Sequence, residues 1–168
     1  MRKKSLVLVL AFVMMFALAG CDMISGLLGG KTEGEVGTTL KTSWFDFTVN
    51  SAEEADSYAD YTAAEGNKLV VVEVTETNTS SDELPMGTFD FKLDDPADTE
   101  YYVAAMAPLD SSMMPEDFYL GANETVTYTL VFEVPSTSSN FTLVFTEYGI
   151  DSSGNESTGD TFKVTLGF

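Results

Sequence analysis

Alternation of apolar and polar residues in short segments narrows the possible folds of this chain most strongly. In residues 124–135, ETVTYTLVFEVP, one parity carries Val126, Tyr128, Leu130, Phe132 and Val134. The other parity carries Thr125, Thr127, Thr129 and Glu133. A period of two is typical of a β-strand with one buried face and one wet face. It argues against an amphipathic helix there, because the faces of a helix repeat every 3.6 residues.

Similar segments recur along the chain, at residues 42–50, 67–78, 88–93, 99–106, 141–149 and 161–168. The connections between them are rich in Gly, Pro, Asn, Asp and Ser, which is turn chemistry. About seven or eight short strands with such turns predict an all-β fold, a two-sheet antiparallel β-sandwich. The alternation also predicts that one face of each sheet is exposed to solvent.

The parity of each segment predicts its core side chains. Those expected inside are Phe45, Phe47, Val49, Val70, Val72, Val74, Phe89, Phe91, Leu93, Phe141, Leu143, Phe145, Phe162, Val164 and Leu166. Trp44 has the opposite parity and is expected to face outward or to cover a sheet edge. Residues 51–66 lack an apolar stripe, so they are expected to form a long loop with a turn of helix.

The N-terminal residues have the order of a secretory signal. Basic residues at positions 2–4 precede an apolar run over residues 6–18 and the small residues Ala19 and Gly20. We therefore expect residues 1–20 to be a signal peptide. The chain has one cysteine, Cys21, directly after this segment, so no disulfide can form within the chain.

The residues Leu18-Ala19-Gly20-Cys21 resemble the bacterial lipobox. This resemblance implies removal of the lipoprotein signal peptide 1–20 and attachment of a diacylglycerol to Cys21, which would anchor the protein in membrane lipid. Residues 21–35, rich in glycine, then form a flexible tether, and residues 36–168 form the sandwich domain. An ordinary signal with a chance cysteine, or a retained N-terminal helix, would also fit these residues.

The chain is strongly acidic, with 27 acidic residues, 8 basic residues and a formal charge of −19. Three of the basic residues lie within residues 1–20, so the remainder has a formal charge of −22. This charge argues against nucleic acid as a partner, because phosphate binding depends on Lys and Arg. Solubility, adaptation to salt, or attraction of calcium or a basic partner would each account for it.

The absence of histidine from the sequence excludes Ser-His-Asp and Cys-His catalysis and most zinc sites. Carboxylates remain, and a glycan-processing enzyme needs two of them across a cleft. With 27 acidic residues such pairs arise by chance, so no catalysis and no catalytic residue is expected. A carboxylate-dependent enzyme is the third alternative for the function.

An acidic turn contains the candidate calcium ligands. They are Asp94, Asp95, Asp98 and Glu100, and hard oxygen ligands suit calcium. The chemistry of an Asp-Pro turn explains the same residues equally well. No cofactor is expected, with calcium as the alternative that the acidic turn leaves open. A calcium-responsive or structural envelope domain is accordingly the second alternative for the function.

Two stretches resemble a bacterial family known only as a domain of unknown function. They are GNKLVVVEVTETNTSSDELPMGTFDFKLDDPADTEYYV and YLGANETVTYTLVFEVPSTSSNFTLVF. The resemblance covers roughly residues 37–168. It implies a secreted or lipid-anchored protein, similar in fold to telokin and to the mycobacterial immunoprotective extracellular protein, both immunoglobulin-like sandwiches. One departure is Glu76, which takes the inward parity of the Val-rich strand, where an unpaired carboxylate would be costly.

These features together predict a lipoprotein held at the extracytoplasmic face of a bacterial cell membrane. Its expected role is to bind a protein, glycan or envelope partner through loops and a sheet edge. Candidate partner contacts are Tyr58, Tyr61, Tyr101, Tyr102 and Tyr119. Three methionines, Met106, Met113 and Met114, would form either an adaptable apolar surface or a packed cover over a sheet.

Overall fold

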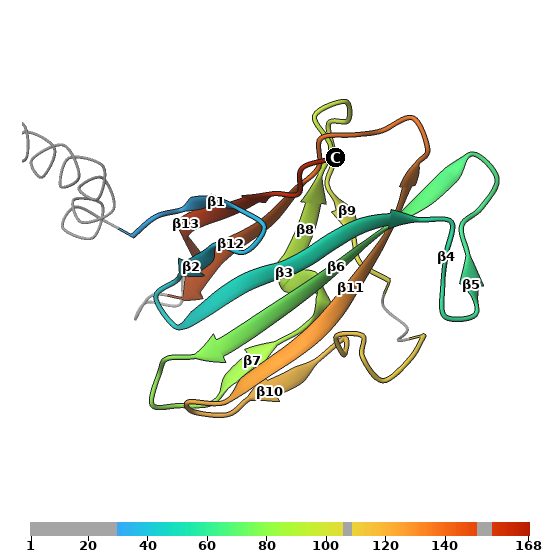
Figure 1. The fold of residues 1–168 in the computed structure, drawn as a ribbon. Coiled ribbons are helices and arrows are strands. Elements are labelled where there is room, and N and C mark those ends of the chain that lie inside the picture. Colours follow the sequence, from blue (N-terminus) through green and yellow to red (C-terminus); the bar gives the residue numbers. More distant parts are fainter. Residues whose placement is uncertain (1–29, 106–108, 151–155) are drawn as a thin grey trace, which may run out of the picture. The chain divides into compact units, whose positions relative to one another are not determined.

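The computed structural model describes residues 30–105, 109–150 and 156–168. Within them, Thr32–Phe168 forms one compact β unit, drawn in Figure 1. The proposed signal peptide, Cys21 and Met106 lie outside the described residues.

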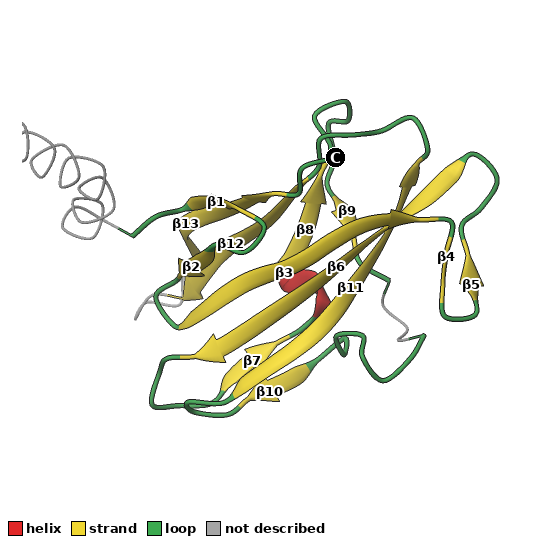
Figure 2. Ribbon diagram, viewed as in Figure 1, coloured by secondary structure: helices red, strands yellow, loops and turns green. Residues whose placement is uncertain are grey.

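Two main sheets build this unit. One has the order β1 (Glu33–Glu35), β13 (Glu156–Thr165), β12 (Thr142–Ile150), β8 (Phe91–Asp94) and β9 (Tyr102–Val103). The other has the order β11 (Thr125–Pro135), β6 (Asn67–Asn78), β3 (Phe45–Ala55) and β2 (Thr39–Lys41). Two small two-stranded sheets pair β7 (Leu84–Met86) with β10 (Phe118–Leu120), and β4 (Ser57–Tyr58) with β5 (Tyr61–Thr62); the second of these is a hairpin. A single turn of 3-10 helix, η1 (Thr88–Asp90), is the red element in Figure 2.

The strand order is that of an immunoglobulin-like sandwich. Strands β3, β6 and β11 are neighbours in one sheet, like strands A, B and E, and β8, β12 and β13 match C, F and G in the other. From β6 the chain crosses to the other sheet for β8 and β9, returns for β11, and crosses again for β12 and β13. The predicted all-β sandwich is therefore confirmed. One pairing departs from the antiparallel expectation, because β1 lies parallel to β13.

Phenylalanine rings from both sheets fill the core. Phe47 of one sheet and Phe91 of the other have ring centroids 5.5 Å apart, and those of Phe45 and Phe145 are 5.0 Å apart. Both pairs meet edge to face, a geometry that contributes about 0.5–1.5 kcal/mol beyond burial. The inward parities predicted from the sequence are confirmed for every expected core residue except Phe89.

Phe89 is 45% exposed, so its predicted place in the core is wrong. The residue belongs to η1, not to a strand, and β8 begins only at Phe91. The alternation of a strand therefore does not extend back to it.

The prediction for residues 51–66 is also wrong. Strand β3 continues to Ala55, paired with β6, and the hairpin of β4 and β5 follows. A register shift between Val49 and Ser51 lets the pairing continue. The hydrogen bonds of the ladder thus outweigh the intrinsic helix preference of these alanines and glutamates.

A second apolar cluster lies on the outer face of the sheet that contains β6. Its buried members are Leu69, Val71, Met113 and Val131. Met113 therefore forms part of a packed cover, whereas Met114 lies in the main core. The expectation that this face is exposed to solvent is wrong at this end of the sheet, because the segment that contains Met113 covers it.

Candidate functional site

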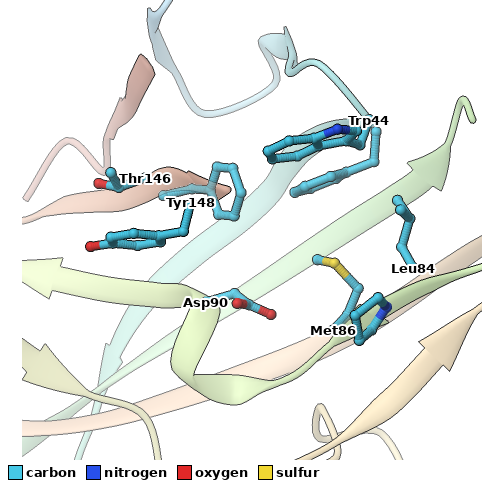
Figure 3. A pocket seen from close by; sticks show the side chains of 9 residues that line it. Trp44, Leu84, Met86, Asp90, Thr146 and Tyr148 are labelled. Atoms are coloured by element: carbon cyan, nitrogen blue, oxygen red, sulfur yellow. The ribbon is translucent and has the colours of Figure 1, made fainter. Parts of the chain in front are cut away.

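Two adjoining pockets lie at the end of the sandwich where β3 begins. The first has a volume of about 250 Å³ and is lined by Trp44, Phe45, Leu84, Pro85, Met86, Asp90, Phe145, Thr146 and Tyr148. The second has a volume of about 510 Å³ and is lined by Pro85, Met86, Gly87, Phe89, Asp90, Glu116, Asp117, Phe118 and Tyr119. They share Pro85, Met86 and Asp90, and we call the two together the Asp90 groove. In Figure 3, Asp90 lies across the first pocket from Trp44, with Tyr148 on one side and Met86 on the other.

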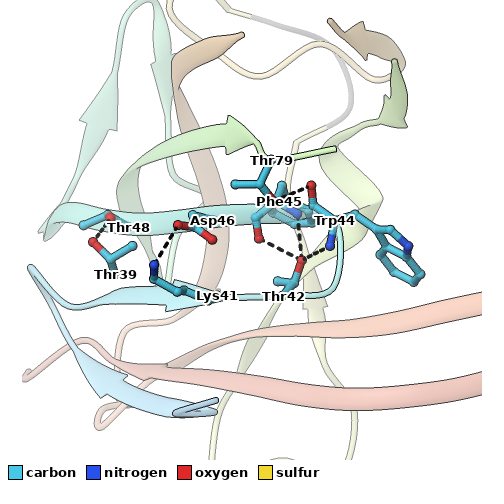
Figure 4. Close-up of polar contacts among 8 residues, drawn as sticks. All are labelled: Thr39, Lys41, Thr42, Trp44, Phe45, Asp46, Thr48 and Thr79. Atoms are coloured by element: carbon cyan, nitrogen blue, oxygen red, sulfur yellow. Dashed lines mark hydrogen bonds and ion pairs between the residues drawn. The ribbon is translucent and has the colours of Figure 1, made fainter. Parts of the chain in front are cut away.

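A hydrogen-bonded turn fixes the backbone of Trp44, as Figure 4 shows. The hydroxyl of Thr42 accepts hydrogen bonds from the N–H groups of Trp44 (3.2 Å) and Phe45 (3.0 Å). The carbonyl of Trp44 accepts from the N–H and the hydroxyl of Thr79, at 3.0 Å and 2.9 Å. The indole is half-buried and packs on the core. Trp44 thus covers the end of a sheet, as the sequence suggested, and forms a preorganised wall of the pocket.

Strand β12 supplies another wall of the pocket, beside a β-bulge. Between Thr146 and Tyr148 its pairing with β13 shifts register, so two residues of β13, Gly159 and Asp160, lie opposite Glu147. Glu147 is buried, and its carboxylate accepts hydrogen bonds from the N–H groups of Ser43 (2.7 Å) and Asp160 (3.3 Å). It therefore ties the turn before Trp44 to the other sheet. Tyr148, next in sequence, is 64% exposed at the mouth of the pocket.

The turn that carries Asp90 is held against the segment before β10. Oδ2 of Asp90 accepts a hydrogen bond of 2.7 Å from the N–H of Gly87. A Cβ on Gly87 would collide with the backbone carbonyl of Glu116, so this close approach requires glycine. The approach brings Glu116 and Asp117 to the groove on the side of Asp90.

Glu76 is buried near Asp90, with 1% of its surface exposed. In the described part of the chain, neither of its carboxyl oxygens has a hydrogen-bond partner. Burial, and then the Asp90 charge, raise the pKa of the Glu76 carboxyl to about 8. Glu76 is therefore mostly protonated at neutral pH, which avoids the cost of a buried charge.

Asp90 is also perturbed, but it is only half-buried. Desolvation raises its pKa, the hydrogen bond from Gly87 lowers it, and the Asp117 charge raises it again. Among the residues that the structure describes, its other oxygen, Oδ1, has no protein donor. Chemically, the groove combines apolar and aromatic walls with a partly desolvated carboxylate.

The candidate calcium ligands take part in turn hydrogen bonds. Asp95 is buried and accepts from the N–H of Ala97 at 2.8 Å. Asp98 accepts from the hydroxyl of Tyr102 at 2.9 Å, which, together with bonds from nearby backbone N–H groups, lowers the pKa of Asp98. Asp94 is half-buried on β8 and Glu100 is exposed. Across residues 30–105, 109–150 and 156–168, no group of three or more carboxylates is placed to hold a metal ion.

The candidate tyrosine contacts do not form one surface. Tyr101 and Tyr119 are exposed, but only Tyr119 lines the Asp90 groove. Tyr61 donates a hydrogen bond to Glu133, and the hydroxyl of Tyr58 is paired with that of Ser112.

The sequence alone did not indicate Asp90 or Tyr148 as site residues. Its one signal for this end of the fold was Glu76, a carboxylate at an inward position.

The fold and the groove define an all-β sandwich protein with a candidate ligand site at one end of the sandwich. In the described residues, no helix has the length and apolar character needed to cross a membrane. The chain belongs to the family described as a domain of unknown function, DUF4352, whose sequence profile matches residues 34–156. A search of curated proteins finds no match.

Several solved structures share the fold. The chain is 21% identical to ycdA of Bacillus subtilis, provisionally described as a lipoprotein, with a TM-score of 0.56. That match covers 78% of this chain, which spans only 39% of the length of ycdA. The yjhA protein of Bacillus subtilis is 19% identical, with a TM-score of 0.56 and coverage of 79% of this chain and 98% of that one.

A secreted protein of Mycobacterium tuberculosis, MPT63, is 11% identical, with a TM-score of 0.55 and coverage of 68% of this chain and 88% of that one. At these identities the likeness shows the fold alone. The membership of a family without an assigned function, expected from the sequence, is confirmed. The likeness to telokin stays a prediction.

Proposed function

We propose that this chain is an exported, lipid-anchored binding protein that takes its ligand in the Asp90 groove at the extracytoplasmic face of a bacterial membrane. The observation that carries the binding role is the pocket of about 250 Å³ between Trp44 and Asp90. Apolar walls with a few polar groups are the usual composition of a ligand site. The proposal includes no catalytic step, because the sequence contains no histidine and its sole thiol is Cys21.

The order of residues 2–21 supports the anchor, through a basic start, an apolar run and a lipobox-like end at Cys21. A diacylglycerol on Cys21 would hold the protein to membrane lipid, since two acyl chains suffice for stable anchoring. The ligand would then come from a protein, a glycan or a small molecule of the cell surface.

The anchor is tested by mass spectrometry of the protein purified from membranes. We expect a mature chain that begins at Cys21 and carries the mass of a diacylglyceryl group, and we expect Cys21→Ala to abolish that mass and membrane retention. An unmodified thiol on a membrane-retained chain would contradict the anchor.

Trp44 gives a direct test of binding, because it is the only tryptophan of the chain and it lines the pocket. The full chain in detergent micelles is titrated with neutral sugars, amino acids, carboxylic acids, organic amines and short peptides. We expect at least one class to change Trp44 emission saturably and to raise the melting temperature. N-acetyltryptophanamide, titrated in parallel, controls for direct quenching. If no class does both, the proposed function is wrong.

A further inference from the structure

We propose that the ligand of the Asp90 groove is an organic ammonium ion, held by the Asp90 carboxylate between the rings of Trp44 and Tyr148. This inference rests on the proposed function and adds to it the chemical class of the ligand. It is carried by three features of the groove: its aromatic walls, its uncompensated carboxylates and the absence of basic residues from its lining.

The aromatic walls suit a cation. Trp44 and Tyr148 lie on different sides of the space that Asp90 faces in Figure 3. The face of an aromatic ring attracts an ammonium group, and tryptophan does so most strongly. The sulfur of Met86 adds a polarizable contact for the methyl or methylene groups that such a ligand carries. In the adjoining pocket, Phe89 and Tyr119 extend these walls, and both side chains are exposed.

The carboxylates of the groove lack a counter-charge. Asp90, Glu116 and Asp117 line it, and its lining includes no lysine or arginine. The ion pairs of the described residues lie elsewhere, between Lys41 and Asp46 and between Lys68 and Glu54. A partly desolvated carboxylate is stabilised by a neighbouring cation. Since only one Asp90 oxygen accepts a protein hydrogen bond among the described residues, the other is free to accept from an ammonium group.

Glu76, behind the lining of the groove, adds a second observation. It is buried, neither of its oxygens has a partner in the described part of the chain, and the charge of Asp90 is one cause of its raised pKa. A cation beside Asp90 would offset the Asp90 charge, which no basic residue of the lining does. The acidic excess of the whole chain would also raise the local concentration of cations near the groove.

Other ligand classes fit less well. An anionic ligand would meet the charges of Asp90, Glu116 and Asp117 without a basic residue of the lining to offset them. A sugar would leave most of its hydroxyl groups against the apolar side chains of Phe45, Leu84 and Phe145. The charge of an ammonium ion is therefore the property that the groove can select.

The test compares choline with 3,3-dimethylbutan-1-ol, which has nearly the same shape and no charge. The full chain in detergent micelles is titrated with each compound by calorimetry, at low and at moderate salt. We expect choline to bind at least tenfold more tightly than the alcohol, with weaker binding at the higher salt. Spermidine and Nα-acetyl-lysine amide are titrated in the same way, to distinguish a free amine from a lysine side chain of a protein as the natural source.

Two substitutions locate the site. Asp90→Asn keeps an oxygen that can accept from the N–H of Gly87, and it should lower the affinity for the ammonium probes at least tenfold. Glu53→Gln removes an exposed carboxylate near the other end of β3 and should change the affinity less than twofold. The melting temperature of Asp90→Asn shows whether this variant is folded. If it is not folded, the comparison of choline with the alcohol on the natural chain decides.

The inference is wrong if the alcohol binds as tightly as choline, if a folded Asp90→Asn variant binds the ammonium probes normally, or if none of these probes binds. If sugars, acids or neutral peptides perturb Trp44 while ammonium ions do not, this inference fails and the proposed function stands. If no compound of any class binds, both fail.

Discussion

Glu76 on β6 and Glu147 on β12 are both buried in the sandwich, yet only Glu147 has hydrogen-bond donors. Glu147 is 6% exposed and accepts from the N–H groups of Ser43 and Asp160. Glu76 is 1% exposed, and in the described part of the chain its carboxyl oxygens accept no hydrogen bond. The first carboxylate joins two segments, whereas the second is kept neutral by its surroundings.

This difference shows that burial alone does not define the role of a carboxyl group. Both residues are linked to the Asp90 groove. Glu147 accepts a hydrogen bond from the turn that holds Trp44, and the charge of Asp90 helps to raise the pKa of Glu76. Removing Glu147 should destabilise the fold, and removing Glu76 should stabilise it.

Glu76→Met should stabilise the protein by about 4 kcal/mol more at pH 8 than at pH 4. The pKa of this carboxyl is about 8 in the folded state and 4.5 without the fold. Below pH 4.5 both states hold the proton. As the pH rises from there to 8, only the unfolded state loses it, so the stability of the natural chain falls over this window. Methionine keeps an unbranched shape without a titrating group.

Urea unfolding at pH 4 and pH 8 measures this effect. Asp90 contributes its own pH dependence to both proteins, so the difference between them isolates Glu76. Equal slopes of stability against pH in the two proteins would show that Glu76 is not kept neutral.

Glu147→Ala should lower the free energy of unfolding by about 3 kcal/mol, because two backbone N–H groups lose a charged acceptor. The emission of Trp44 should shift to the red as the turn that contains Ser43 loosens. Denaturation at pH 7 measures both effects, and Glu53→Ala serves as the control for loss of an exposed carboxylate. A stability within 0.5 kcal/mol of the natural chain, by the usual scale of surface substitutions, would contradict the assigned role of Glu147.

Gly159→Ala tests the position of the Glu147 side chain from the neighbouring strand, β13. A Cβ there would lie 2.7 Å from Oε2 and 2.9 Å from Cβ of Glu147, so the side chain would have to move. We expect a loss of about 1–2 kcal/mol from this overpacking. Combined with Glu147→Ala, the loss should be smaller than the sum of the two single effects, since the collision with the carboxylate is then removed and only the contact with Cβ remains. Strict additivity in this double-mutant cycle would argue against the clash.

Thr88→Val should have the smallest effect, a gain of up to about 1 kcal/mol. The hydroxyl of Thr88 is buried and, like the Glu76 carboxyl, has no partner among the described residues. Valine keeps the shape and removes the unpaired polar group. Thermal unfolding measures the change, and a loss above about 1 kcal/mol would indicate that the hydroxyl has a partner such as a bound water.

The strands and the core were predictable because period-two alternation depends on neighbouring residues only. Phe45 and Phe47 on β3 and Phe162 on β13 lie inside, as their parity indicates. The burial of Leu69 and Val71 on β6 did not follow from alternation. Residues 69–72 are apolar at both parities, which indicates a strand buried on both faces, whereas the prediction assumed that one face of each sheet is exposed to solvent.

The site was far less predictable. Trp44, Asp90 and Tyr148 come from segments on three sides of the pocket, and only the fold brings them together. Two departures from regular structure also matter, the turn η1 that carries Asp90 and the bulge of β13 opposite Glu147, and neither has a strong sequence signal. The position of Glu76 was visible in the sequence, but its lack of partners depends on residues distant along the chain.

The parallel pairing of β1 with β13 has a mechanical consequence. In a parallel pair, the N-terminal end of one strand and the C-terminal end of the other lie at opposite ends, here at Glu33 and Thr165. A pulling force applied between these ends acts along both strands, so the hydrogen bonds between them share the load and do not open one after another. The same force on an antiparallel edge hairpin would separate its hydrogen bonds one at a time, so this pair of strands is arranged to resist tension applied between Glu33 and Thr165.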